Sequence, residues 1–411
     1  MLPVDEAVSR VLTTVRAVGV ETVDVASALG RVLARDVVSS VDVPPWDTSA
    51  MDGYAVRAAD AAPGASLTLQ PPIAAGRLAT VAVAAGLAAP IATGAPMPDG
   101  ADAVVIVEDT DAARTGEVSL RAGAEPGAWV RRRGADLRTG QTVLTAGATL
   151  NAAQLGLLGS IGLTKVAVAR RARVAILITG DEVAKPGDAR TPGQLWSSNH
   201  LVLAGLVEAA GAVVAEVGFV GDDLEATVSA LRSIGDVDVV LTTGGVSVGA
   251  RDVTRDALER VGVSREFYKV RMQPGKPLAF GLWSRPSGEV AVFGLPGNPV
   301  SCAVVFVTMV RPWLRAAMGA ARPHLPIVFA TAGEALRSGP GRARFERVRL
   351  TDGPTGRVAW ATGDRSSGVL SSLARADGLM VLGPDTPGPQ PGEPVRVLLL
   401  AGEAERVDYG W

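Results

Sequence analysis

The residues best suited to chemistry lie in a glycine-rich segment after a short apolar run. Val239, Val240 and Leu241 predict a strand buried on both faces, and residues 242–252 then supply threonines, glycines, a serine and the carboxylate of Asp252. Glycine leaves backbone N–H groups free to face an anion, and open α/β sheets bind ligands at the carboxyl ends of their strands. The segment therefore predicts either an anion-binding loop or a tight corner before a helix.

Carboxylates follow two other predicted strands. The strand 174–179 leads through a glycine to Asp181 and Glu182, and the strand 213–220 leads to Asp222. Adjacent acids repel each other unless solvent or a cation separates them, so a cation or ligand site and a solvated turn both fit. For Asp222, the N-cap of a helix fits as well as a site, because another acid follows three residues later.

Two further turns carry groups that bind anions. Lys276 stands between a glycine and a proline, and a lysine beside glycine is a common phosphate binder. In 295–301, Asn298 before Pro299 predicts the start of a helix, whose N-terminus attracts anions. A helix start alone does not explain the Pro-Gly pair that precedes it.

A loop rich in acids and aromatic residues lies earlier in the chain. Residues 45–55 combine Trp46, Asp47, Asp52 and Tyr54 around an Asp-Gly turn. Simple turn chemistry fits this pattern, but the aromatic residues favour an exposed recognition loop.

The composition argues against several classes of function. A net charge of −2 gives no reason to expect nucleic acid or an anionic membrane as partner. The single cysteine, Cys302, excludes an internal disulfide and lies in an apolar run typical of a buried packing residue. With His200 and His324 as the only histidines, a His-rich metal site is not expected. Signal-peptide and membrane-spanning patterns are lacking, so we expect a soluble, cytoplasmic protein.

The elements around these residues predict a multi-domain α/β plus β architecture. Between 170 and 322, strands alternate with helices, which predicts a mostly parallel sheet covered on both faces, and 299–317 predicts a long apolar helix. Residues 46–136 consist of short Val/Ala runs broken by Gly and Pro, which predicts a β-rich inserted domain. Residues 323–411 are again β-rich and predict a separate C-terminal domain.

Several motifs in a fixed order resemble one known family. The loop 242–249 with Asp252 is similar to the core of molybdopterin-binding domains, which molybdopterin adenylyltransferases and some nucleotide hydrolases share. The whole set resembles the molybdopterin molybdenumtransferase family, the bacterial counterpart of the gephyrin E domain, and the resemblance covers essentially the entire chain. The other motifs of the set are 49–55, 93–98, 132–136, 180–182, 274–277 and 295–299.

The resemblance implies an elongated homodimer of four-domain chains. Residues 1–45 and 137–169 would form one N-terminal linker domain around the insertion 46–136, and 170–322 would hold the adenylylated pterin. The β-barrel-like domain 323–411 of the partner subunit would close the cleft. Ser366 and Ser367 would then reach the site from the other chain.

The implied reaction is insertion of molybdate into adenylylated molybdopterin, with release of AMP and a requirement for Mg²⁺. Carboxylate oxygens suit this hard ion, and it can neutralise and orient a phosphoanhydride without a histidine. The resemblance implies Asp52, Glu182, Asp222 and Asp252 as catalytic residues, of which Glu182, Asp222 and Asp252 are the metal candidates. It also implies a molybdopterin adenylyltransferase as partner. The implied substrate-binding residues are Thr93, Arg131, Asp136, Thr243, Gly244, Gly245, Ser247, Gly249, Lys276, Pro296, Gly297, Asn298, Pro299, Ser301, Ser366 and Ser367.

Two positions depart from the family pattern. Gln273 stands where a lysine often precedes Pro-Gly-Lys, so one anion contact is expected to be weaker. Ser197 stands where an acid often precedes Ser-Asn, and Asn199 fits the cap of the helix that follows.

Two other functions fit the α/β domain. An adenylyltransferase or nucleotide pyrophosphatase would need neither of the β-rich domains at 46–136 and 323–411. A non-catalytic scaffold would not need the retained acids and Lys276.

Overall fold

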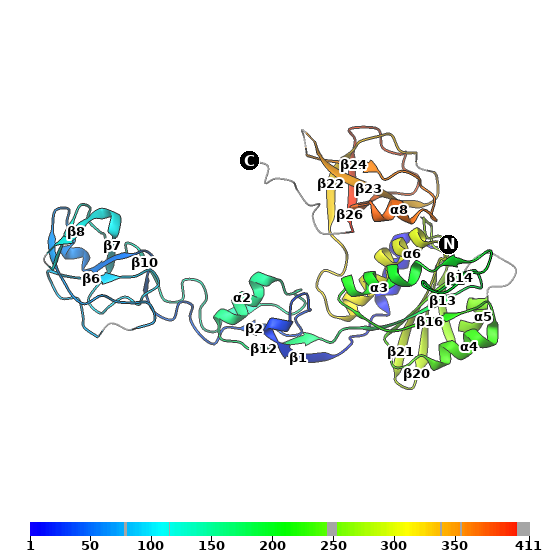
Figure 1. Cartoon of the computed structure of the whole chain (residues 1–411), viewed down its shortest axis with the longest axis horizontal. Coiled ribbons are helices and arrows are strands. Elements are labelled where there is room, and N and C mark those ends of the chain that lie inside the picture. Colours follow the sequence, from blue (N-terminus) through cyan, green and yellow to red (C-terminus); the bar gives the residue numbers. More distant parts are fainter. Residues whose placement is uncertain (78–79, 115, 245–252, 338, 354–355, 401–411) are drawn as a thin grey trace.

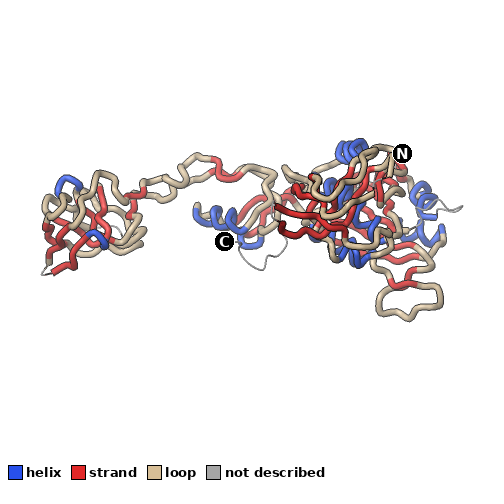
Figure 2. The backbone as a smooth tube through the Cα atoms, turned by 90° about the horizontal axis from the view of Figure 1, so that it is seen from above, coloured by secondary structure: helices blue, strands red, loops and turns tan. Residues whose placement is uncertain are grey.

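The chain is elongated, with its largest mass at one end and a small β-rich body at the other (Figure 1). Figure 1 shows the computed structural model, which describes residues 1–411 except 78–79, 115, 245–252, 338, 354–355 and 401–411. An α/β region and a C-terminal barrel form the large end, and a thin linker leads to the inserted β region (Figures 1 and 2).

The α/β region is built on a sheet with the strand order β16-β13-β17-β21-β20-β18. The first four strands run parallel to one another, and β20 is antiparallel to both of its neighbours, β21 and β18. The prediction of a mostly parallel sheet is therefore confirmed. The strands are β13 (Arg173–Thr179), β16 (Val213–Val220), β17 (Val239–Thr243), β18 (Val263–Tyr268), β20 (Ala279–Arg285) and β21 (Gly288–Leu295).

Helices cover both faces of this sheet because its strands are apolar on both. On β13, Ile176 and Ile178 face one buried cluster, whereas Ala175 and Leu177 face another. The first cluster includes residues of α3 (Asn199–Ala209) and of the long helix 299–317. The second includes residues of α4 (Leu224–Ser233) and α5 (Val253–Arg260).

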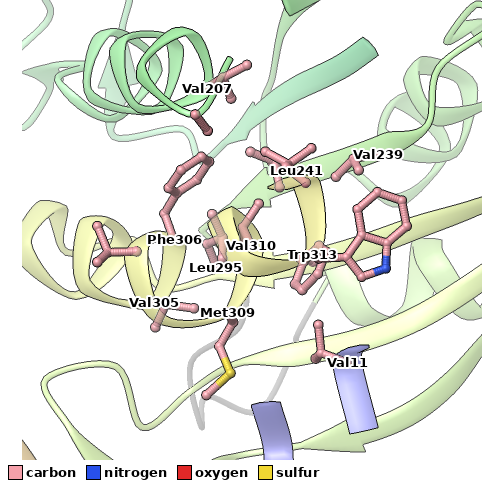
Figure 3. Packing of buried hydrophobic residues seen from close by; sticks show 14 of the residues in the cluster. Val11, Val207, Val239, Leu241, Leu295, Val305, Phe306, Met309, Val310 and Trp313 are labelled. Atoms are coloured by element: carbon pink, nitrogen blue, oxygen red, sulfur yellow. The ribbon is translucent and has the colours of Figure 1, made fainter. Parts of the chain in front are cut away.

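The predicted helix over 299–317 is confirmed, with an irregularity in its middle. It consists of α6 (Pro299–Val305), the π-helical turn η4 (Phe306–Val310) and α7 (Arg311–Ala317). Pro312 explains the wider turn, because it has no N–H to donate and its ring clashes with the carbonyl four residues earlier. The helix is long and apolar enough to cross a membrane, but 83% of its apolar window is buried in the core. Figure 3 shows its residues packed against the sheet and α3.

The first helix, α1 (Val4–Thr13), belongs to the same core. Ala7 and Val11 are buried in it, and the indole N–H of Trp313 donates to the Thr14 hydroxyl at 3.2 Å. This differs from the expected grouping of residues 1–45 with the linker domain.

The linker combines segments from both sides of the insertion. β1 (Val20–Asp24) pairs with β12 (Lys165–Ala169), and β2 (Val37–Val38) pairs with β11 (Thr142–Leu144), all antiparallel. The 3₁₀ turn η1 (Val25–Ser27) and α2 (Ala152–Ser160) complete it, and Asn151 begins α2 with a capping box.

The inserted region is a small β structure with the strand order β7-β4-β6-β5-β9-β8 and a separate β3–β10 pair. The short 3₁₀ turns η2 (Ala58–Asp60) and η3 (Val107–Asp109) lie between strands. The strands are β3 (Thr48–Ser49), β4 (Gly53–Val56), β5 (Ser66–Leu69), β6 (Leu87–Ile91), β7 (Ala103–Ile106), β8 (Thr110–Arg114), β9 (Glu117–Leu120) and β10 (Val130–Arg131).

The C-terminal region is a closed barrel, as predicted. Its order β23-β24-β22-β26-β25 is closed by pairing of β25 with β23. A short strand of the α/β region, β19 (Met272–Gln273), pairs in parallel with β23, so the barrel is joined to the α/β region of its own chain. The barrel elements are β22 (Ile327–Ala332), β23 (Ala343–Gly353), β24 (Gly356–Ala361), α8 (Leu370–Ala374), β25 (Gly378–Leu382) and β26 (Pro394–Leu399).

Candidate active site

A cavity of about 920 Å³ lies between the carboxyl edge of the α/β sheet and the barrel. Its wall includes the ends of β13 and β17, the segment 272–277, the start of α6 and the barrel segment 365–368. Segments far apart in the sequence therefore meet in one place. The predicted site residues that line it are Glu182, Thr243, Gly244, Lys276, Pro296, Gly297, Asn298, Pro299, Ser301, Ser366 and Ser367.

Gly244 fits the end of β17 only because it has no side chain. Its φ is +91°, and a Cβ there would lie 2.5 Å from the carbonyl oxygen of Thr179. The Thr179 hydroxyl in turn donates to the Thr243 carbonyl at 2.9 Å and lies 3.2 Å from the Thr254 hydroxyl of α5. The strand end is thus held closely against its neighbour. The predicted loop residues Gly245, Ser247, Gly249 and Asp252 lie outside the described residues.

The start of α6 is held by the barrel of the same chain. Asn298 is the N-cap residue, as expected, but its side chain makes no capping bond and instead donates to the Ser367 hydroxyl at 3.0 Å. The Ser367 carbonyl accepts from the Val300 N–H at 3.1 Å and so satisfies one of the free amides of the helix start. The resemblance implies that a partner subunit supplies Ser366 and Ser367, but both belong to the same chain as the rest of the cavity wall.

Asn199 also supports this turn. We expected it to cap its own helix, but it does not. Its side-chain amide donates to the Gly297 carbonyl at 2.6 Å, across 98 residues of sequence. The N-cap position of α3 belongs to Ser198, which makes no side-chain capping bond. Nearby, the buried Ser197, which lines the cavity, has its hydroxyl 2.9 Å from Nδ1 of His200.

The barrel contributes a basic wall that none of the sequence motifs indicated. Arg342, Arg344 and Arg365 line the cavity, and the guanidinium groups of the last two lie 3.4 and 3.7 Å from the buried carboxylate of Glu346. Burial raises the pKa of Glu346, and the neighbouring arginines oppose that shift. Together with Lys276, these groups suit an anionic ligand. The alternation of arginine at 342 and 344 could have indicated a shared strand face.

The acids at the sheet edge form a second group. Glu182 lines the main cavity, whereas Asp181 lines a smaller one of about 230 Å³. The Asp222 N–H donates to the Asp181 carboxylate at 3.0 Å. The capping bond of α4 comes from Asp223, which accepts from Ala226 N–H at 2.7 Å, so the side chain of Asp222 is not the cap.

Carboxylate oxygens lie directly against glycines at this edge. A Cβ at Gly180 would lie 2.5 Å from a carboxylate oxygen of Glu182, and a Cβ at Gly221 would lie 2.5 Å from one of Asp181. Glycines thus leave space for carboxylates at two neighbouring strand ends, a donor set that fits Mg²⁺. Among the described residues alone, no three potential ligands come together, and Asp252 lies outside them.

The predicted residues of the inserted region form a separate group. Asp52 accepts from the N–H and the hydroxyl of Thr93 at 2.6 and 2.9 Å, and these hydrogen bonds hold the pKa of Asp52 below its usual value. Arg131 lies exposed on β10, and Asp136 is exposed beyond it. Figure 1 shows this region at the opposite end of the molecule from the α/β region and the barrel, whose residues line the cavity. Within one chain, therefore, Asp52 and Thr93 meet each other but do not meet Glu182.

Comparisons with known proteins agree along the chain. Residues 2–162 match the family model described as the MoeA N-terminal region (domain I and II), residues 175–316 match the probable molybdopterin binding domain, and residues 330–400 match the MoeA C-terminal region (domain IV). The chain is 41% identical to molybdopterin molybdenumtransferase 2 of Mycobacterium tuberculosis, over 87% of this chain and 90% of the relative. It is 33% identical to the molybdopterin molybdenumtransferase of Haemophilus influenzae, over 97% and 98% of the two chains.

A solved structure has the same fold throughout. The crystal structure of the molybdopterin biosynthesis MoeA protein from Pyrococcus horikoshii OT3 superposes with a TM-score of 0.82 at 29% identity, over 97% of this chain and 100% of that one. The order of motifs, the cavity between the α/β region and the barrel, and these matches lead to one conclusion. This chain belongs to the molybdopterin molybdenumtransferase (MoeA) family.

Proposed function

We propose that this chain inserts molybdate into adenylylated molybdopterin and releases AMP. The observation that carries the proposal is the cavity that Gly244, the α6 start and Lys276 line together with the arginines of the barrel. Its volume of about 920 Å³ falls within the range usual for sites that enclose a ligand of this size. A substrate with phosphates at one part and a metal oxyanion at another needs several cationic groups in one enclosed space.

Each part of the cavity has a role in this reaction. Lys276 and the arginines at 342, 344 and 365 attract the phosphates and molybdate, and the positive end of the α6 dipole favours negative charge. The contact of Asn298 with Ser367 holds the barrel against the α/β region and so limits the access of water.

Glu182 and Asp222, with Asp252, would hold Mg²⁺ at the sheet edge. Bound there, the ion would neutralise phosphate charge and orient the reacting oxygen. A molybdopterin adenylyltransferase would supply the substrate.

The Asp52–Thr93 pair supports a homodimer as the active unit. Its carboxylate is kept ionised and oriented by two hydrogen bonds, although the inserted region lies at the opposite end of the chain from the α/β region and the barrel (Figure 1). If Asp52 positions molybdate or water, as the resemblance implies, a second copy must bring it to the cavity. We therefore propose that the inserted region of one subunit completes the cavity of the other.

The function is tested with purified protein, adenylylated molybdopterin, Mg²⁺ and molybdate. AMP release should depend on molybdate and should fall at least tenfold in a Lys276→Met variant, since a hydrogen bond to a charged group contributes about 1.5–3 kcal/mol. A Lys165→Met variant, in which the exposed lysine of β12 is removed, should release AMP as the wild type does. Absence of molybdate-dependent AMP release would exclude the function, and consumption of ATP with free molybdopterin would indicate an adenylyltransferase instead.

The composite site is tested by mixing two inactive variants. Glu182→Gln and Asp52→Asn each remove one half of the proposed site. In a mixed dimer, one cavity would combine both defects and the other would have neither, so co-expression should restore activity in the heterodimers. Continued inactivity of isolated heterodimers would refute the contribution of Asp52 from a second copy.

A further inference from the structure

One aromatic side chain at the cavity is exposed in an unusual way. Trp196 ends β15 (Leu195–Trp196), lines the cavity and remains 53% exposed, and it belongs to none of the buried hydrophobic clusters of the described chain. The other described aromatic residue that lines the cavity, Phe345, is buried. A large ring that leaves its area uncovered beside a ligand cavity is available to stack on a ligand.

The ring of Trp196 is also held in one orientation. The Arg190 guanidinium lies over one of its faces, 4.0 Å from the ring centroid, and the indole N–H donates to the Asp188 carbonyl at 3.1 Å. Arg190 donates in turn to the Gln194 carbonyl at 3.2 Å. One face of the indole is therefore covered by a cation, while about half of the side chain stays exposed at the cavity.

The loop that carries these contacts is anchored to the strand end. The side chain of Gln194 donates to the Asp181 carbonyl at 2.9 Å and accepts from the Thr191 N–H at 3.0 Å. β15 pairs in parallel with β14 (Val183–Ala184), directly after Glu182. A ring fixed before the ligand arrives loses little conformational entropy on binding, which is the condition for an efficient stacking platform.

We propose that Trp196 is the stacking platform for a planar nitrogen heterocycle of the substrate, with Arg190 supporting its far face. This rests on the proposed function, in which the substrate contains two such rings, the pterin and the adenine. The cations Lys276, Arg342 and Arg344 suit the charged part of the ligand, and Trp196 offers the aromatic surface that a heterocycle needs. Either ring has the required chemistry, and the experiment below distinguishes them.

The test measures binding of three probes by calorimetry to the full-length protein: AMP, 6-hydroxymethylpterin and inorganic pyrophosphate. Trp196→Ala should weaken one heterocyclic probe by about 5- to 150-fold, the usual effect of losing one aromatic–base stack. Trp196→Phe should keep most of that affinity. Pyrophosphate, which has no ring, should bind all variants equally. Loss of AMP affinity would assign the platform to adenine, and loss of pterin affinity would assign it to the pterin.

Trp360→Ala is the matched control. Trp360 is also a half-exposed tryptophan, 44% accessible on the barrel strand β24, and it does not line the cavity. Unchanged affinity of Trp196→Ala for both heterocycles would overturn the proposal, and so would an equal loss of pyrophosphate, which would mean that the cavity itself had changed. Weaker heterocycle binding in a protein without molybdate-dependent AMP release would support the platform while excluding the proposed reaction.

Discussion

Replacing Gly244 by alanine tests the geometry at the end of β17. The new Cβ would lie 2.5 Å from the carbonyl oxygen and 2.8 Å from the hydroxyl of Thr179, at a φ of +91°. That φ costs about 1–2 kcal/mol for a residue with a side chain. Relieving the overlap displaces Thr179, whose hydroxyl contacts Thr243 and Thr254, and each lost hydrogen bond costs about 1 kcal/mol. We expect a total destabilisation of about 2–4 kcal/mol.

Two glycines of the same α/β region separate these contributions. Gly262 has a φ of +93°, and an added Cβ would meet no atom within 4 Å, so Gly262→Ala should cost only the conformational part, about 1–2 kcal/mol. Gly205 lies in α3 with ordinary φ and open space, so Gly205→Ala should be neutral or stabilising by up to about 1 kcal/mol. The difference between the variants at 244 and 262 isolates the contact with Thr179.

The measurement is urea unfolding followed by tryptophan fluorescence, to which the buried Trp283 and Trp313 contribute, together with AMP release. Gly244→Ala should lower both stability and turnover, because the residue lines the cavity. Equal destabilisation at 244 and 262 would refute the close contact with Thr179. Equal effects at 244 and 205 would refute the backbone conformation as well.

Three further results are expected. Ser367→Ala removes the hydrogen bond from Asn298 and should lower kcat/KM about fivefold, which corresponds to the free energy of about 1 kcal/mol of one hydrogen bond. Little change in Tm is expected, and unchanged steady-state kinetics would contradict the role of this contact. Burial raises the pKa of the Cys302 thiol, so iodoacetamide should label it only after urea is added, and labelling of the native protein would contradict its burial. Burial lowers the pKa of both His200 and His324, with smaller contributions from nearby cations, so the unfolded chain takes up protons first as the pH falls below 6.5. The contribution of the two histidines to the free energy of unfolding is complete above that pH and decreases below it. Between pH 7.5 and 5.5, Tm should therefore fall by less in a His200→Gln/His324→Gln variant than in the wild type. An equal fall in both proteins would contradict this assignment.

The sheet and its helices could be predicted because their signals are local. The run 213–220 is apolar and β-branched, and its predicted bounds agree with those of β16 at both ends. The part of the cavity wall that the α/β region supplies could be predicted for the same reason, since glycine at 244, lysine at 276 and an Asn-Pro helix start each have a local signature.

The basic wall and the origin of Ser367 could not be predicted in this way. In the sequence, Arg342 and Arg344 resemble the exposed side of any strand, and they line the cavity because β23 pairs with β19 of the α/β region, which brings the barrel to the sheet edge. Which subunit supplies Ser367 depends on how the barrel packs, which no short segment encodes. The bond between Asn199 and Gly297 crosses 98 residues, so its local pattern indicated only a helix cap.

The π-helical turn Phe306–Val310 has a consequence for the rotational phase of the long helix. Such a turn is equivalent to one residue inserted into an α-helix. Near the other end of the helix, the buried Arg315 donates to the Ala210 carbonyl at 3.3 Å and to the Thr149 hydroxyl of the linker. Deleting one residue within 306–310 would turn this end by about 100° and shift it by about 1.5 Å relative to the cavity. Arg315 would then lose both acceptors. The inserted residue therefore keeps the two ends of this long helix correctly oriented, one at the cavity and the other at the linker.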